Sequence, residues 1–166
     1  MGRVNALSYN PDAPAVFQTV DWTCSACSLA WLNGALYIDH ATDEWSAVDY
    51  IGNPENINPE WGLMDGSGDR LVQCLREQGA PALNGWFDWH TAYQLALRWP
   101  LLIGGVGWNH WAGVRSASVN QLLLANPAPG WMGVNGTLNN QQWIQLGPFA
   151  VVAVPLLAEF PPLPTT

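Results

Sequence analysis

The sequence predicts an α+β fold, in which a helical N-terminal half is followed by an antiparallel sheet. Before Pro100 the apolar residues recur mostly at helical spacing, whereas from Leu101 onward they form short runs bounded by Gly, Asn and Pro. The chain has 166 residues, of which 49% are apolar and 11 are Trp, and this suits one domain with a dense aromatic core. We expect this domain to span residues 1–155, with a Pro-rich tail or linker at 156–166.

The helical half is expected to follow an extended segment at residues 1–23. Thr23 stands at an N-cap position, so the first helix should begin at Cys24. The third helix should end at Gly79, and the fourth should end before Pro100. The predicted helices cover residues 24–36, 43–51, 69–78 and 89–98.

The second half is expected to contain four strands, at 101–106, 110–115, 121–125 and 149–154, and one helix at 139–146. If the second and third strands form a hairpin centred on Ser118, residues whose numbers sum to 236 face each other. This register places His110 opposite Asn126, with Ala112 opposite Leu124 and Val114 opposite Leu122.

The charge of the chain narrows the classes of partner. Five Arg and no Lys stand against 13 Asp plus Glu, for a net charge of −8, which disfavours nucleic acid and anionic membranes.

No apolar run reaches the ~20 residues that span a bilayer, and the N-terminal residues lack the apolar core of a signal peptide. We therefore expect a soluble protein that is cytoplasmic on synthesis. The sequence indicates no particular oligomeric state.

Four polar residues, in the order Gln18, Cys24, His110 and Asn126, predict thiol chemistry. A thiol that attacks a carbonyl needs a base, a group that orients the base, and donors for the oxyanion. Cys24 would be the nucleophile, and its place in the first turn of a helix should lower its pKa. His110 would be the base and Asn126 its orienting partner, while the Gln18 carboxamide and the Cys24 amide would hold the oxyanion. This chemistry needs no metal or other cofactor.

Other functions of the same residues remain open. Cys27 in Cys24-Ser25-Ala26-Cys27 is an alternative nucleophile, although the spacing from Gln18 favours Cys24. The Cys-x-x-Cys pair also fits half of a zinc site, but the sequence offers no second close pair of ligands. It also fits a redox pair, but no buried strand is predicted before it. Three aromatic residues that flank the site in sequence are candidates for a substrate groove: Trp22, Trp108 and Trp111.

At these residues the chain resembles the papain-like cysteine peptidases, and more closely their compact bacterial branch, the C39-like peptidases. Residues 18–31 are similar to that family's Gln-x5-Cys followed by a helix of small and apolar residues. Residues 110–114 are similar to its His-x-x-x-Val strand, and residues 123–127 to its strand ending in Asp/Asn-Pro. Cys24 and His110 are 110 − 24 = 86 residues apart, whereas cathepsin-type enzymes have ~130 or more. The resemblance therefore implies the compact papain-like fold, not the full two-lobed one.

The resemblance implies a cysteine endopeptidase with a Cys-His-Asn triad and a peptide substrate. Residues 130–133 and 146–149 look like the closing part of C39-like modules in bacterial and phage cell-wall proteins. We therefore expect cleavage of peptidoglycan peptides, with the protein acting at the cell wall after release or as part of a virion. Two alternatives remain: processing of a leader peptide after Gly-Gly, and a catalytically silent binding or virion module that keeps the fold.

Overall fold

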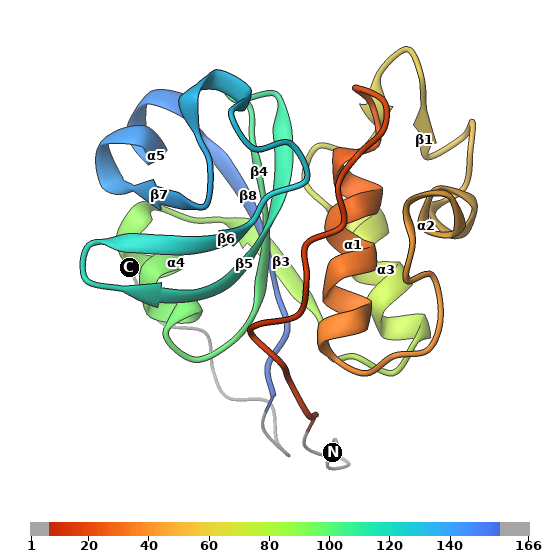
Figure 1. Cartoon of the computed structure of the whole chain (residues 1–166), viewed down its shortest axis with the longest axis horizontal. Helices are drawn as coiled ribbons and strands as arrows, with labels where there is room; N and C mark the ends of the chain where they lie inside the picture. The colour runs from red at the N-terminus through yellow and green to blue at the C-terminus, as the bar shows by residue number, and fades with distance from the viewer. Residues whose placement is uncertain (1–6, 157–166) are drawn as a thin grey trace.

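The computed structural model describes residues 7–156 and confirms the predicted α+β fold (Figure 1). Residues 1–6 and 157–166, which include most of the expected Pro-rich tail, lie outside the described residues. The helices are α1 (Cys24–Ala35), α2 (Glu44–Ile51), α3 (Asp69–Glu77), α4 (Trp89–Ala96), α5 (Asn140–Leu146) and the 3-10 turn η1 (Trp131–Gly133). None of the helices within residues 7–156 combines the length and apolarity needed to cross a bilayer.

One antiparallel sheet forms the second half of the molecule. Its strands are β3 (Leu83–Trp86), β4 (Leu101–Gly105), β5 (His110–Ser118), β6 (Gln121–Ala125), β7 (Thr137–Asn139) and β8 (Phe149–Ala153). They are arranged in the order β3-β8-β4-β5-β6-β7, so each predicted strand lies between two neighbours. A small separate sheet pairs β1 (Ile57–Asn58) with β2 (Gly62–Leu63).

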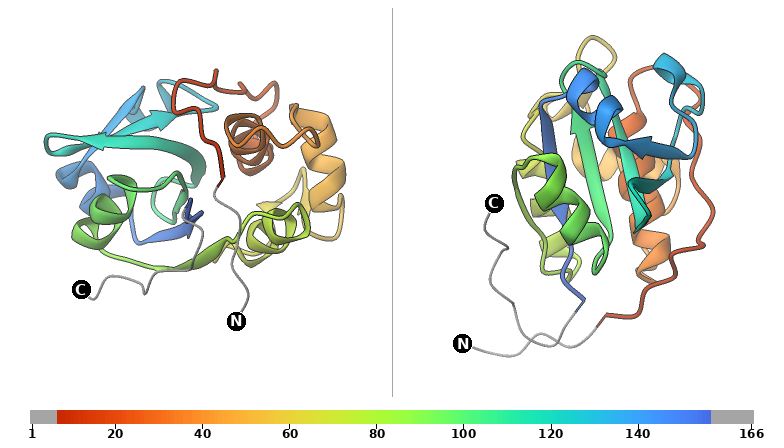
Figure 2. Two further views of the ribbon diagram at one scale, coloured as in Figure 1. Left: turned by 90° about the horizontal axis from the view of Figure 1, so that it is seen from below. Right: turned by 90° about the vertical axis from the view of Figure 1, so that its left-hand side faces the viewer.

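Helices cover both faces of the large sheet. Helices α1, α2 and α3 lie on one side, and α4 and α5 lie on the other, as the three views show (Figures 1 and 2). Strand β4 contributes to both cores because successive side chains point to opposite faces. Leu102 packs in the core shared with α1, whereas Leu101 and Ile103 pack in the core shared with α4 and α5.

Helix α1 is the central helix, because ten of its 12 residues are buried. Trp31 lies directly over Gly113 of β5, where a Cβ atom would come within 2.3 Å of the indole ring. The Trp31 indole N–H also donates to the carbonyl of Ala13, 3.1 Å away, in the extended segment that precedes α1. A side chain at position 113 would therefore push α1 away from the sheet.

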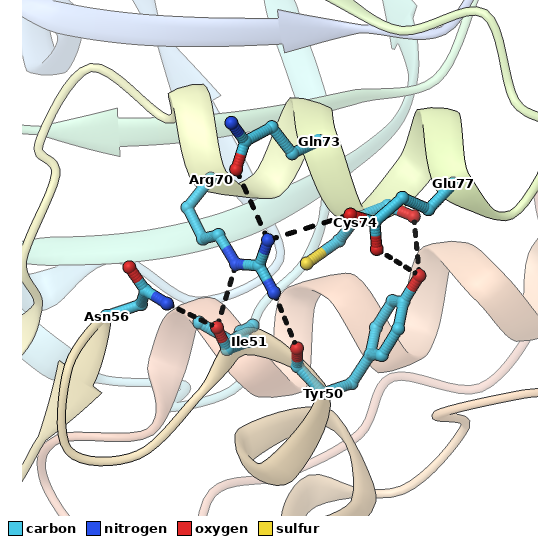
Figure 3. A network of polar contacts seen from close by, with 7 residues as sticks. All are labelled: Tyr50, Ile51, Asn56, Arg70, Gln73, Cys74 and Glu77. Carbon is cyan, nitrogen blue, oxygen red and sulfur yellow. Dashed lines mark hydrogen bonds and ion pairs between the residues drawn. The ribbon is translucent and has the colours of Figure 1, made fainter.

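A network of polar contacts joins α2 to α3 (Figure 3). The Arg70 guanidinium donates to the carbonyls of Ile51 and Tyr50, at 2.8 and 2.9 Å, and so satisfies the C-terminal end of α2. The Tyr50 hydroxyl donates in turn to the carboxylate of Glu77 on α3, at 2.9 Å. Arg70 and Tyr50 thus hold α2 and α3 together from both sides of the contact.

Replacing Arg70 with Ala is expected to lower the free energy of unfolding by about 2 kcal/mol, because two helix-terminal carbonyls lose a charged donor. Urea denaturation of the purified chain measures this difference. Arg98→Ala is the matched control, since Arg98 is exposed and its side chain makes no hydrogen bond or ion pair with another residue of 7–156, and it should change stability by less than about 0.5 kcal/mol. Equal losses in the two variants would contradict this role of Arg70.

Four short strands were not predicted. Strands β1 and β2 have two residues each, and β7 has three, so none is long enough to show a period of two. Strand β3 contains Asn84 and Gly85, residues that are depleted in strands, and it forms because β8 offers its edge. Tertiary pairing, not local preference, determines these elements.

Candidate active site

Cys24 is the first residue of α1, as the sequence predicts. Its sulfur accepts a hydrogen bond from the backbone N–H of Trp111, with an N–S distance of 3.3 Å. Trp111 follows His110 directly at the start of β5, so this contact joins the N-terminus of α1 to the strand that carries the histidine. Cys24 and His110, which are 110 − 24 = 86 positions apart in the sequence, therefore line the same cleft.

The structure brings His110 and Asn126 into direct contact. His110 Nε2 lies 2.8 Å from Asn126 Oδ1, and both side chains are buried. The Asn126 amide nitrogen donates to the carbonyls of Val134 and Asn135, at 3.1 and 2.9 Å, which identifies Oδ1 as the acceptor. His110 Nε2 therefore carries the proton, and Nδ1 is left as the basic nitrogen.

The contact forms in a register different from the predicted one. Ser118 pairs with Gln121, so the turn is centred on residues 119–120 and not on Ser118. A bulge between Val114 and Ser116 then shifts the register, and Val114 pairs with Leu124 where Leu122 was expected. Extending this register places Asn126 opposite Ala112, on the same face as His110 and two residues away from it. A diagonal pair on one face still lies within reach of long side chains.

Trp108 does not line a groove, so this expectation is wrong. Its side chain is completely buried, and its ring meets the His110 ring edge to face, with centroids 4.7 Å apart and planes at 74°. Its indole N–H points to the carbonyl of Trp131, and the Trp131 indole donates to the carbonyl of Trp108. Trp108 thus packs against the imidazole, and the orientation of that ring is held by Trp108 and Asn126 together.

Gln18 lies next to the site but is not among the described residues that line the cleft. Its backbone N–H donates to the carbonyl of Pro127, the residue after Asn126, at 3.1 Å. Its side-chain nitrogen donates to the carbonyl of Val20 at 3.0 Å, whereas its side-chain oxygen is buried without a partner. The amide nitrogen of Gln18 therefore keeps one N–H for a further acceptor.

A cleft of about 350 Å³ opens at Cys24 and His110. One wall comes from the β4–β5 turn, and Trp111 and the half-buried Trp22 also line it, while their expected role in a substrate groove stays a prediction. The β1–β2 hairpin also lines the cleft, through the exposed Glu60 and Trp61 of its turn. Sequence reasoning missed these two residues because the hairpin strands were not predicted. The remaining lining residues are Asp21, Pro59, Gly62, Leu63, Gly66, Gly104, Gly105, Val106 and Asn109.

Burial controls the protonation of the two groups. It raises the pKa of the Cys24 thiol, and the backbone N–H groups of Trp111, Ser25 and Cys24 offset this only in part. The first-turn N–H groups of Ser25 and Cys24 do lower this pKa, but desolvation outweighs them, so the expectation of a net lowered pKa is wrong for the free protein. Burial also lowers the pKa of His110 below its ordinary value, against the opposing effect of the Asn126 hydrogen bond. At neutral pH the site holds a neutral thiol beside a neutral imidazole.

Cys27 is placed differently from Cys24. It is fully buried in the helix, and burial, with the nearby carboxylate of Glu44, raises its pKa to about 12. Cys74 is also buried and free. Of the three thiols, only that of Cys24 reaches the cleft.

No family model matches the sequence, and no curated protein matches it either. Solved structures do match. The peptidase domain of Streptococcus ComA, a bifunctional ABC transporter of a quorum-sensing pathway, superposes with a TM-score of 0.62 at 18% identity, over 86% of this chain and 98% of that one. A Bacillus anthracis protein assigned as a C39-like peptidase gives a TM-score of 0.61 at 15% identity, over 90% and 98% of the two chains. A double-glycine-motif protease of an AMS/PCAT transporter, solved with a leader peptide, gives 0.60 at 14% identity, over 93% and 94%.

The matches cover nearly the whole of each chain. This chain has the C39-like peptidase fold. The resemblance in the sequence therefore predicted the fold correctly. Within the C39-like fold, the cleft lies where the N-terminus of α1 meets the start of β5.

The buried His110 predicts a dependence of stability on pH. The folded state lowers the pKa of His110 below its ordinary value of about 6.5, which the unfolded chain keeps. At a pH between the folded-state pKa and the unfolded-state pKa, the unfolded chain therefore binds more protons than the folded one. Its contribution to stability is therefore complete above about pH 6.5 and is lost as the pH falls toward the folded-state pKa, by up to about 1.4 kcal/mol per pH unit.

Urea denaturation between pH 7.5 and 5 measures this loss. A His110→Gln variant cannot titrate at this position and should show a shallower decline over the same range. Identical slopes for the two proteins would contradict the burial of a neutral His110.

Proposed function

We propose that the chain is a cysteine peptidase in which Cys24 is the nucleophile and His110 the base. One observation carries the proposal: the Cys24 thiol and the His110 ring line the same cleft, and Asn126 fixes that ring with its basic nitrogen free. The fold of cysteine peptidase domains is consistent with this role.

Attack begins with the proton of the Cys24 thiol. His110 Nδ1 accepts this proton as the sulfur attacks the peptide carbonyl carbon, so the neutral pair becomes a thiolate and an imidazolium only as the bond forms. The negative charge moves to the carbonyl oxygen. The backbone N–H of Cys24 and the free N–H of Gln18 are the proposed donors to this oxygen.

The amine leaves next. The tetrahedral intermediate collapses, the C–N bond breaks, and the imidazolium returns its proton to the departing nitrogen. The Cys24 sulfur then holds the acyl group as a thioester. His110 deprotonates a water molecule that attacks this thioester. The C–S bond then breaks, the imidazolium returns the proton to the Cys24 sulfur, and the carboxylic acid product leaves the regenerated thiol.

The proposed substrate is a peptide of bacterial peptidoglycan. Residues 130–133 and 146–149, which resemble cell-wall modules, support this choice. The charge of the cleft agrees with it: among the described residues that line the cleft, Asp21 and Glu60 are acidic and none is Arg. Such a cleft suits a stem peptide whose diamino acid carries a free amine. The protein would act at the cell wall after release, or as part of a virion.

A second candidate is the processing of a leader peptide. The double-glycine-motif protease that shares the fold was solved in complex with a leader peptide, and this supports a similar use of the cleft here. A catalytically silent module with the same fold is the third candidate.

Two substrates distinguish these functions. The purified chain is incubated with bacterial cell-wall sacculi and, separately, with a synthetic leader peptide containing Gly-Gly, and products are identified by mass spectrometry. Soluble wall peptides with new termini, absent with Cys24→Ala, are the expected result. Cleavage of the leader peptide alone would favour processing, and cleavage of neither would contradict both peptidase proposals.

A further inference from the structure

Glu44, the first residue of α2, is a buried carboxylate that faces the segment leading to Cys24. Its Oε1 accepts from the backbone N–H of Thr19 at 2.8 Å and from the hydroxyl of Thr23 at 2.7 Å. Its Oε2 accepts from the hydroxyl of Thr19 at 2.8 Å. Three donors from two residues therefore converge on one side chain. A carboxylate so deeply buried needs such donors to offset its loss of hydration.

These bonds change what Thr23 does at the N-terminus of α1. A threonine that precedes a helix normally accepts a hydrogen bond from an N–H of the first turn. Thr23 makes no such side-chain bond: its hydroxyl is directed toward Glu44 Oε1, at 2.7 Å, and toward the carbonyl of Val20, at 3.2 Å. The N–H groups of Ser25 and Ala26, which such a cap would satisfy, are therefore not bonded to the Thr23 side chain. An uncapped helix N-terminus can bind an anion such as an oxyanion.

The other end of the same segment is also fixed. Gln18 donates through its backbone to Pro127, next to Asn126, while its neighbour Thr19 is held by Glu44. The side chain of Gln18 and the thiol of Cys24 therefore belong to one segment, which is bonded both to Glu44 of α2 and to Pro127 beside Asn126.

We propose that Glu44 is a positioning residue that holds Thr19 and Thr23 so that the Cys24 thiol meets His110 and the first turn of α1 stays uncapped. This inference rests on the proposed thiol chemistry. Glu44 touches neither the substrate nor the reacting atoms, and it acts through the segment 18–24.

The rate at which iodoacetamide alkylates Cys24 at pH 7 tests the proposal without a peptide substrate. Glu44→Ala removes both acceptor oxygens, and with them all three hydrogen bonds, and is expected to slow alkylation about tenfold, because small displacements of reacting groups are costly. Glu44→Gln should stay within about threefold of the wild type, because its amide oxygen replaces Oε1 and its N–H can donate to the Thr19 hydroxyl. Asp49→Asn removes an exposed carboxylate from the same helix and should have no effect.

A purely electrostatic role predicts the opposite sign. Removal of a negative charge near the N-terminus of α1 would ease loss of the thiol proton, so both Glu44 variants would be alkylated faster. That result, or a folded Glu44→Ala with the wild-type rate, would overturn the proposal. If Glu44→Ala does not fold, Thr23→Val decides, because it removes the hydroxyl contacts to Glu44 and Val20 and no charge. A slowing of about threefold or more supports the proposal, and an unchanged rate overturns it.

Failure of the proposed function gives a different result. In that case the wild-type thiol itself reacts no faster than the Cys24 thiol of a His110→Ala variant, whatever residue occupies position 44.

Discussion

Replacing Cys24 with Ala is expected to abolish peptide hydrolysis, with a loss of at least about a thousandfold in kcat, because no other group in the cleft can form the thioester. The rate at which peptides are released from cell-wall sacculi, or at which the leader peptide is cleaved, measures this loss. Cys24 is partly accessible and lines the cleft, so the substitution leaves the core intact.

Cys27→Ala is the matched control for the nucleophile. Cys27 lies one turn further along α1 and is fully buried, so its replacement should leave kcat within a few fold of the wild type while lowering stability by about 1 kcal/mol. The reverse pattern, with Cys27→Ala inactive and Cys24→Ala active, would show that the second cysteine of the Cys-x-x-Cys pair is the nucleophile.

His110→Ala should reduce kcat by about a thousandfold, because the raised pKa of the Cys24 thiol leaves almost no thiolate at neutral pH without a base. Asn126→Ala should cost less, about ten- to a hundredfold. The imidazole remains in this variant, supported by Trp108, but it loses the acceptor that fixes its tautomer and orientation.

The order of these two losses is the informative result. Steady-state kinetics of both variants against the wild type gives it, with circular dichroism to confirm that each is folded. A loss in Asn126→Ala as large as that in His110→Ala would contradict a supporting role for the amide. An unchanged kcat in His110→Ala would show that His110 is not the base.

Much of the site could be predicted from the sequence because local signals are strong there. Thr23 before a run of small and apolar residues predicts a helix that begins at Cys24, and α1 begins at that residue. The contact between His110 and Asn126 was also predicted, although through the wrong register. The bulge at Arg115 and the turn at residues 119–120 shifted the strands without separating the two side chains. Residues on one face of a strand pair tolerate such a shift of two positions.

What the sequence did not predict depends on contacts between distant segments. Glu44 has no local pattern that distinguishes it from the other acidic residues; its burial follows from how α2 packs beside the segment that leads to Cys24. Trp61 reaches the cleft through a hairpin of two-residue strands. The raised pKa of Cys24 follows from desolvation, which the helix position alone does not reveal. Each of these features needs the tertiary structure.

The central claim is that Cys24 and His110 act as a coupled thiol and base. The most direct test is alkylation of the wild-type chain with iodoacetamide at pH 7, followed by mass spectrometric mapping of Cys24, Cys27 and Cys74. We predict that Cys24 is modified faster than Cys27 and Cys74, because of the three thiols only that of Cys24 reaches the cleft and can pass its proton to His110 as it reacts, and that His110→Ala slows this reaction about tenfold or more. Slow modification of Cys24 at the same rate in both proteins would contradict the account.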